Sequence, residues 1–207
     1  MRNKRRKESR SSKKGSSDAI VVLFLIALFA GIGYLVFVVP SITNHDTSTI
    51  ARAKVGDAAP DFRLPTADGG FVSLREFKGS SILIFFNEGA ACEPCWRQTV
   101  ELQNSPELTR MRVDLVVVTA DPVDHLQPIV NQYGIRVPVA SDISLDMAAA
   151  YNALSGGKQE GQKLSYAFIL VGPDGTIEWR YDATNNSGKY ISTQQLIAAV
   201  NKAQGTS

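Results

Sequence analysis

The segment Cys92-Glu93-Pro94-Cys95-Trp96 contains the only two cysteines of a 207-residue chain. It follows the strongly apolar run ILIFF at residues 82–86 and leads into residues 96–108, whose composition suits a helix. The pattern therefore predicts a buried strand, a short loop, and a cysteine pair at the start of a helix. Two cysteines with this spacing in this place are typical of a redox dithiol.

The start of the helix explains why the first cysteine would be reactive. Free backbone N–H groups and the positive end of the helix dipole favour the thiolate of Cys92 near neutral pH. Cys95 lies one turn further on, where it can attack a mixed disulfide on Cys92 and release the product. Pro94 suits the first turn because its missing N–H costs little there. Glu93 is acidic, and its charge is expected to oppose a neighbouring thiolate.

Two other interpretations of the cysteine pair stay open. A structural zinc site needs four ligands, and His45 and His125 are not at ligand spacing from the cysteines. A purely structural disulfide would close a very short loop, where the gain in chain entropy is small. The redox dithiol is preferred over both. No metal and no cofactor are expected beyond a redox-active Cys92–Cys95 disulfide.

The net charge of +2 hides an uneven distribution along the chain. Residues 1–18 carry eight basic and two acidic side chains, so the remainder has a net charge of −4. The part of the chain that can fold is therefore mildly acidic, and no nucleic-acid partner is predicted. The basic run is better explained as the flank of a membrane segment.

Residues 19–39, AIVVLFLIALFAGIGYLVFVV, contain no charged side chain. At about 1.5 Å per residue they reach about 30 Å as a helix, the thickness of the hydrocarbon core of a bilayer. A cleaved signal peptide is the alternative, but its apolar region would be shorter. The sequence predicts a basic cytoplasmic tail (1–18), a single-pass transmembrane anchor (19–39), a linker (40–54) and an extracytoplasmic domain (55–207).

The order of apolar runs and turn residues after residue 55 predicts the fold class. Strands and helices alternate first, and a pair of strands and a final helix follow. This order indicates an α/β domain with three layers and a central mixed sheet. The predicted strands are 61–64, 71–74, 81–87, 114–119, 164–171 and 176–181, and the predicted helices are 96–108, 122–133, 146–154 and 193–203, with a loop at 155–161.

The domain resembles the redoxin branch of the thioredoxin-like superfamily. That branch includes alkyl hydroperoxide reductases, thiol-specific antioxidants and membrane-tethered thiol–disulfide oxidoreductases. The opening VGDAAPDF at 55–62 is similar to its G-x-x-A-P-x-F entry, and LREFKG at 74–79 matches its L-x-x-x-x-G step. FILVGPDG at 168–175 matches its F-x-x-D-x-x-G turn approximately. The resemblance spans residues 55–203 and implies a thioredoxin-like fold.

Two departures from the family pattern bear on function. Thioredoxins place a substrate-docking cis-proline before the late strand, and here Ser165 takes that place, next to Tyr166. Peroxidases of the branch carry P-x-x-x-T/S-x-x-C. Counting back from Cys92 gives Phe85 and Gly89, and counting back from Cys95 gives Glu88 and Cys92, so neither count supplies the proline or the hydroxyl.

Other residues near the dithiol have candidate supporting roles. Glu88 lies four residues before Cys92 and could pass protons to Cys95, or it could be an ordinary exposed carboxylate. Trp96 packs over the site or anchors the helix. Asn87 could orient the loop through a side-chain hydrogen bond. Tyr166 either lines a docking groove or belongs to the core.

The preferred function is a membrane-anchored thiol–disulfide oxidoreductase on the outer face of a bacterial cytoplasmic membrane. Its expected partners are a protein disulfide or peroxide substrate and a membrane electron donor, because the glutathione and thioredoxin pools are cytosolic. A thiol peroxidase of the antioxidant type is the alternative. A copper-carrying module is the third hypothesis, although copper carriers of this fold have a longer cysteine spacing and a histidine near the late strand.

Overall fold

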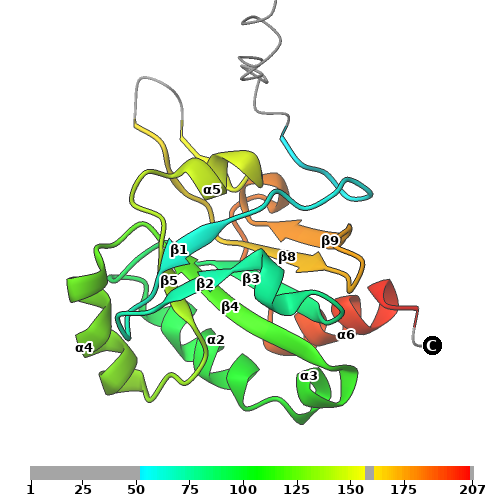
Figure 1. Ribbon diagram of the computed structural model, residues 1–207, viewed down its shortest axis with the longest axis horizontal. Coiled ribbons are helices and arrows are strands. Elements are labelled where there is room, and N and C mark those ends of the chain that lie inside the picture. Colours follow the sequence, from blue (N-terminus) through cyan, green and yellow to red (C-terminus); the bar gives the residue numbers. More distant parts are fainter. Residues whose placement is uncertain (1–51, 157–160, 206–207) are drawn as a thin grey trace, which may run out of the picture. The chain divides into compact units, whose positions relative to one another are not determined.

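A five-stranded sheet lies at the centre of the computed structural model, which describes residues 52–156 and 161–205 (Figure 1). Its order is β5-β4-β3-β8-β9. β3 (Ser81–Phe86), β4 (Val113–Thr119) and β5 (Val139–Ser141) run parallel, while β8 (Ala167–Val171) is antiparallel to β3 and β9 (Ile177–Asp182) is antiparallel to β8. The predicted mixed sheet is thus confirmed.

β3 is the middle strand, and all six of its residues are buried. Its apolar side chains alternate between two hydrophobic clusters, one on each face of the sheet. Leu83 and Phe85 belong to the first cluster, and Ile82, Ile84 and Phe86 belong to the second. A strand buried on both faces reads as a continuous apolar run, which is why the sequence predicted this element well.

Four helices cover the first face of the sheet. They are α2 (Glu93–Gln103), α3 (Pro106–Met111), α4 (Val123–Tyr133) and α6 (Thr193–Ala203). Each contributes leucine or valine side chains to the cluster around Leu83 and Phe85, namely Leu102, Leu108, Leu126, Leu196 and Val200. α6 begins at a capping box in which Ser192 accepts a hydrogen bond from the Gln195 N–H.

The second face is covered by the hairpin β1 (Arg63–Pro65) and β2 (Phe71–Ser73) and by α5 (Asp146–Ala150). The short 3-10 helix η2 (Leu74–Phe77) follows β2 directly. Figure 1 shows α5 on the opposite side of the sheet from α2, α3 and α6. Helices, sheet and this second cover form the three layers that the element order predicted.

Residues 96–108, predicted as one helical segment, belong to two helices, although the cysteine pair does lie at the start of the first one, as predicted. α2 begins at Glu93, with Cys92 as its N-cap, and it ends at Gln103. A separate helix, α3, then starts at Pro106, because Ser105 caps it by accepting a hydrogen bond from the Leu108 N–H. Proline is favoured in the first turn of a new helix and disrupts the interior of a longer one.

Two later predictions also need correction. The predicted helix 146–154 ends at Ala150, and Leu154 instead belongs to β6 (Leu154–Ser155). β6 pairs with β7 (Lys163–Leu164), which splits the predicted strand 164–171 in two. A 3-10 turn, η3 (Thr184–Asn186), follows β9. Of the predicted loop 155–161, residues 157–160 lie outside the described part of the chain.

The predicted cytoplasmic tail, transmembrane anchor and most of the linker lie outside the described residues, which begin at Arg52. Ala53 is already buried, and its N–H donates to the Ala150 carbonyl at 3.0 Å. The folded domain therefore includes residue 53, two positions before its predicted start. Across residues 52–156 and 161–205, no helix is both long enough and apolar enough to cross a bilayer.

Candidate active site

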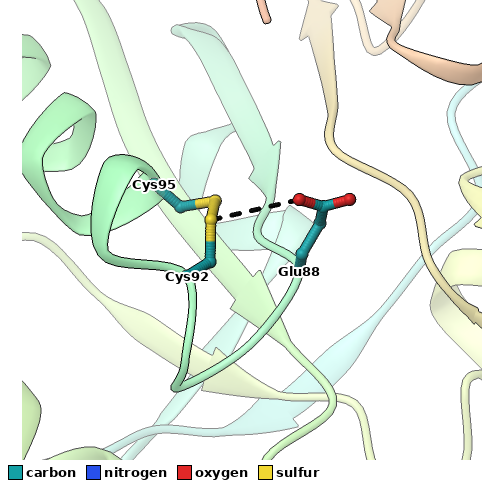
Figure 2. A group of neighbouring side chains, drawn as sticks. All are labelled: Glu88, Cys92 and Cys95. Atoms are coloured by element: carbon teal, nitrogen blue, oxygen red, sulfur yellow. Dashed lines mark hydrogen bonds between the residues drawn. A yellow bond between two sulfur atoms is a disulfide. The ribbon is translucent and has the colours of Figure 1, made fainter. Parts of the chain in front are cut away.

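The two cysteines form a disulfide at the carboxyl end of β3, where the loop after the strand enters α2 (Figure 2). Cys92 is the N-cap of the helix and Cys95 lies in its first turn, with the two Cα atoms 5.3 Å apart. Cys95 is fully buried, whereas Cys92 is partly exposed. Cys92 is therefore the sulfur that an incoming disulfide or thiol can reach.

The helix start surrounds Cys92 with backbone dipoles. The Cys95 and Trp96 N–H groups donate to the Cys92 carbonyl at 3.1 and 3.3 Å. Glu93 and Pro94 occupy the first turn, which confirms the position predicted for Pro94. The positive end of the helix dipole favours a thiolate at the N-cap position.

The negative charge of Glu93, which would disfavour a thiolate at Cys92, is offset by a neighbouring arginine. Its carboxylate accepts from Arg97 at 2.6 Å on the exposed face of α2, and this pairing raises the pKa of Arg97. The ion pair is exposed, so solvent screens it. The predicted opposition between Glu93 and the thiolate is thereby reduced, because an equal positive charge lies beside it.

Glu88 lies closer to the sulfurs. Its Oε2 is 4.0 Å from Cys92 Sγ, and a carboxylate oxygen and the two sulfurs all lie within 4.8 Å of one another. Figure 2 shows this carboxylate pointing at the disulfide from the loop after β3. A carboxylate at this distance is within reach of one bridging water and can exchange protons with the reduced cysteines.

The same three residues are the one cluster of possible metal ligands within residues 52–156 and 161–205. Two thiolates and one carboxylate would leave a tetrahedral zinc ion one ligand short. His125 is exposed on α4 and is not a member of the cluster, and His45 lies outside the described residues. Ser165 and Tyr166 lie just before the late strand β8, where a copper carrier would have a histidine.

The ends of the parallel strands hold the cysteine loop in place. Asn87, directly after β3, accepts from the Gly89 N–H at 2.9 Å, which confirms the predicted hydrogen bond from its side chain. Asp121, just after β4, accepts from the Ala90 N–H at 2.8 Å and from the Thr119 hydroxyl. A Cβ at Gly89, where φ is +120°, would lie 3.0 Å from the Asp121 carboxylate. The loop shape therefore requires glycine at this position.

The sequence interpretation did not identify Asp121 as part of the site. A usable signal was present, because Asn87 and Asp121 both come just after parallel strands that are buried. The carboxyl ends of parallel strands share one edge of a sheet, and polar residues gather there. The position of Asp121 after the run 114–119 was therefore informative.

Of the two roles left open for Trp96, the contacts in the structure support the anchoring of the helix. Its side chain is 1% exposed and belongs to the hydrophobic cluster beneath α2, with its ring centroid 6.5 Å from that of Tyr133. Its indole N–H donates to the Ala90 carbonyl at 3.1 Å. Trp96 thus anchors the helix in the core and fixes the loop that precedes the disulfide.

Ser165 and Tyr166 lie between β7 and β8, and both are buried. The Ser165 hydroxyl donates to the Asp182 carboxylate at 2.7 Å, so this side chain is committed to a bond within the domain. The Tyr166 hydroxyl donates to the Gln98 side chain, and burial raises the pKa of Tyr166. Its ring packs edge-on against Phe85 at 5.3 Å. Tyr166 is therefore a core residue, which is one of the two alternatives predicted for it.

Tyr166 also contributes to a groove of about 350 Å³ beside the cysteine loop. One wall is formed by α2 and the other by the segment that leads into α6. The groove is lined by Pro94, Arg97, Gln98, Glu101, Tyr166, Tyr190, Ile191, Ser192 and Thr193. Tyr166 therefore belongs to the core and also lines this groove. That a substrate docks in the groove stays a prediction.

Residues 55–180 match the AhpC/TSA family. The chain belongs to the AhpC/TSA family. A putative peroxiredoxin of Mycobacterium tuberculosis is 27% identical over 145 residues, covering 67% of this chain and 92% of that protein. The thiol-disulfide oxidoreductase ResA of Bacillus anthracis is 28% identical over 102 residues, covering 48% of this chain and 58% of ResA. The chain is thus similar both to peroxiredoxins and to a dithiol oxidoreductase.

A solved structure supports the fold. Peroxidoxin BcpB of Mycobacterium tuberculosis superposes with a TM-score of 0.61 at 19% identity, over 75% of this chain and 96% of that one. The AhpC/TSA protein is therefore an oxidoreductase with a thioredoxin-like α/β fold and a central mixed sheet. The resemblance to the redoxin branch that the sequence motifs indicated is confirmed.

Proposed function

We propose that this AhpC/TSA protein is a thiol–disulfide oxidoreductase that uses Cys92 as its nucleophile and Cys95 as its resolving cysteine. The observation that carries the proposal is the asymmetry of the disulfide. The partly exposed cysteine is the helix N-cap, and the buried cysteine lies in the first turn of the helix. A reachable cysteine at a helix N-terminus, followed by a buried resolving cysteine, is an arrangement suited to dithiol exchange.

In the first step, the Cys92 thiolate attacks one sulfur of a substrate disulfide. A mixed disulfide forms, the substrate S–S bond breaks, and the departing thiolate takes up a proton. Glu88 then accepts the proton of Cys95, whose thiolate attacks the Cys92 sulfur. The Cys92–Cys95 bond forms, and the second substrate thiolate leaves and is protonated. Two electrons and two protons have passed from the dithiol to the substrate.

Replacing Glu88 by glutamine tests the proton step. The amide keeps the size of the side chain but cannot accept the Cys95 proton, so we expect resolution of the mixed disulfide to slow about 100-fold near neutral pH. Single-turnover kinetics with a reduced chain measure this step directly. Glu93→Gln is the matched control, because Glu93 lies beside the cysteines in sequence but pairs with Arg97. Equal rates for Glu88→Gln and the unmodified chain would contradict the proton role.

Peroxide reduction is the second candidate, favoured by family membership and by the peroxiredoxin relative. The loop argues against an efficient peroxidase. The peroxidase motif would place a hydroxyl three residues before the reactive cysteine, and that position is Gly89, whose N–H is bonded to Asn87. The described site supplies no hydroxyl there to orient a peroxide. We therefore place disulfide exchange first.

One comparison decides between the two activities. The full chain is purified in mild detergent, reduced, freed of reductant, and divided between an insulin-reduction assay and a hydrogen peroxide consumption assay at matched concentration. Fast insulin reduction with negligible peroxide loss supports the oxidoreductase. Fast peroxide loss with slow insulin reduction would overturn it in favour of a thiol peroxidase. A Cys92→Ser chain supplies the baseline for both assays.

We also propose that residues 19–39 anchor the enzyme in the cytoplasmic membrane, with the domain outside and a membrane protein as electron donor. The support is the uncharged run of residues 19–39 behind a basic N-terminal segment. Carbonate-resistant membrane association, together with digestion of the domain by protease added to spheroplasts, is the expected result. Release by carbonate would contradict the anchor, and protection from protease would contradict the orientation.

A further inference from the structure

A tyrosine from a distant part of the chain contacts the carboxylate beside the disulfide. The Tyr190 hydroxyl donates to Glu88 Oε2 at 2.5 Å, across a sequence separation of 102 residues. The same oxygen lies 4.0 Å from Cys92 Sγ. Tyr190 comes from the segment before α6, Glu88 from the loop after β3, and Cys92 from the N-cap of α2. Three different segments of the domain therefore meet at the Cys92 sulfur.

Tyr190 is held in place although it is 50% exposed. Its ring lies on the buried ring of Tyr166, with centroids 4.4 Å apart. The carbonyl of the next residue, Ile191, accepts from the Gln98 amide at 2.8 Å and from the Tyr166 hydroxyl at 3.3 Å. α2 therefore fixes the backbone next to Tyr190, and the core fixes one face of its ring.

The Tyr190 hydroxyl stays protonated at neutral pH and can therefore donate its hydrogen bond to Glu88. Its hydrogen bond to the Glu88 carboxylate raises the pKa of Tyr190 to about 12. Below that pH the hydroxyl keeps its proton and continues to hold the carboxylate. The hydroxyl is therefore available as a donor over the whole pH range in which thiols exchange.

The other charged groups near the sulfurs are already engaged. Glu93 pairs with Arg97 on α2, and Asp121 after β4 is bonded to the Ala90 N–H and to the Thr119 hydroxyl. Glu88 remains as the carboxylate that faces the sulfurs. A contact that fixes the position of the Glu88 carboxylate therefore affects how strongly its negative charge disfavours the Cys92 thiolate.

We propose that Tyr190 is a positioning residue that holds the Glu88 carboxylate beside the dithiol. Tyr190 also lines the groove next to the cysteine loop, so a substrate in that groove would contact the residue that places the proton acceptor. This inference rests on the proposed function, because it assigns Tyr190 to the proton step of disulfide exchange.

The experiment measures the pH dependence of Cys92 alkylation by iodoacetamide in the reduced full chain. A nearby negative charge disfavours a thiolate, so Glu88→Gln is expected to lower the Cys92 pKa by about one unit. Tyr190→Phe removes only the hydroxyl and frees the carboxylate to move away. It is expected to shift the alkylation profile part of the way toward that of Glu88→Gln, and to slow single-turnover resolution about tenfold.

The double variant separates positioning from general loosening of the segment. In a Glu88→Gln chain, Tyr190→Phe is expected to add nothing to either readout. Tyr181→Phe is the matched control, because its hydroxyl donates to the Lys189 carbonyl in the same segment at 2.8 Å without contacting Glu88. That control should keep the alkylation profile of the unmodified chain.

Three results would overturn the inference. They are an unshifted alkylation profile in Tyr190→Phe, an equal shift in Tyr181→Phe, and a full Tyr190→Phe effect in the Glu88→Gln background. The proposed function fails separately, through retention of insulin reduction by Cys92→Ser. A chain in which Cys92 is essential but Tyr190→Phe changes nothing keeps the proposed function and loses only the positioning role.

Discussion

Replacing Cys92 by serine is expected to abolish disulfide reduction, lowering the rate at least about a thousandfold. A serine hydroxyl stays protonated at neutral pH and is a poor nucleophile toward sulfur, whereas the thiolate at this helix N-cap is stabilised. Cys95 cannot take over the attack, because it is fully buried in the first turn of α2. Insulin reduction by the full chain measures the loss.

Cys95→Ser is the matched variant and should fail in a different way. Cys92 remains exposed enough to attack a disulfide, but no second thiol resolves the product. A reduced Cys95→Ser chain mixed with an aromatic disulfide should therefore release one equivalent of thiol and keep the other covalently bound. Mass spectrometry detects the adduct on Cys92. Turnover by Cys92→Ser above one tenth of the unmodified rate would contradict these assignments.

The sequence was informative wherever local composition decides the structure. The apolar run 82–86 predicted a strand at 81–87, and β3 occupies Ser81–Phe86, because a strand buried on both faces needs apolar residues at every position. The helix predicted at 122–133 is α4, and it ends at Tyr133 because Gly134 adopts the left-handed conformation there. The cysteines lie at the strand–helix junction for the same local reason.

The predicted bounds of helices and strands were wrong where the local sequence pattern was weak and other contacts decided the structure. Residues 96–108 read as one helix, but Ser105 and Pro106 together form a cap and a first turn, and the chain starts a new helix there. Leu164 was predicted in the same strand as the residues after it. It pairs instead with Leu154, a choice that depends on a partner strand elsewhere in the sequence.

The contacts that shape the site could not be read from local sequence. The bond from Tyr190 to Glu88 joins residues 102 positions apart, and it exists because α6 packs on the same face of the sheet as α2. The contact of Asp121 with Ala90 depends on the parallel register of β3 and β4. Sequence motifs identified the dithiol, and only the tertiary arrangement identified the groups that tune it.

Trp96 links the stability of the domain to the geometry of this dithiol. Its side chain is fully enclosed beneath α2, and its indole N–H supports the loop through Ala90. Trp96→Ala would leave a large cavity in the main hydrophobic cluster, and we expect it to lower the free energy of unfolding by about 3–5 kcal/mol. Urea unfolding of the oxidised chain measures this change.

Trp96→Phe separates packing from the hydrogen bond. Phenylalanine keeps much of the ring but cannot donate to the Ala90 carbonyl, and we expect a loss of about 1–2 kcal/mol. Trp179, on β9, is only partly buried, so Trp179→Ala should cost less than Trp96→Ala. Equal losses at the two tryptophans would refute the anchoring role. Because Trp96 directly follows Cys95 and donates to the Ala90 carbonyl, the same side chain that stabilises the core also holds the cysteine loop at both of its ends.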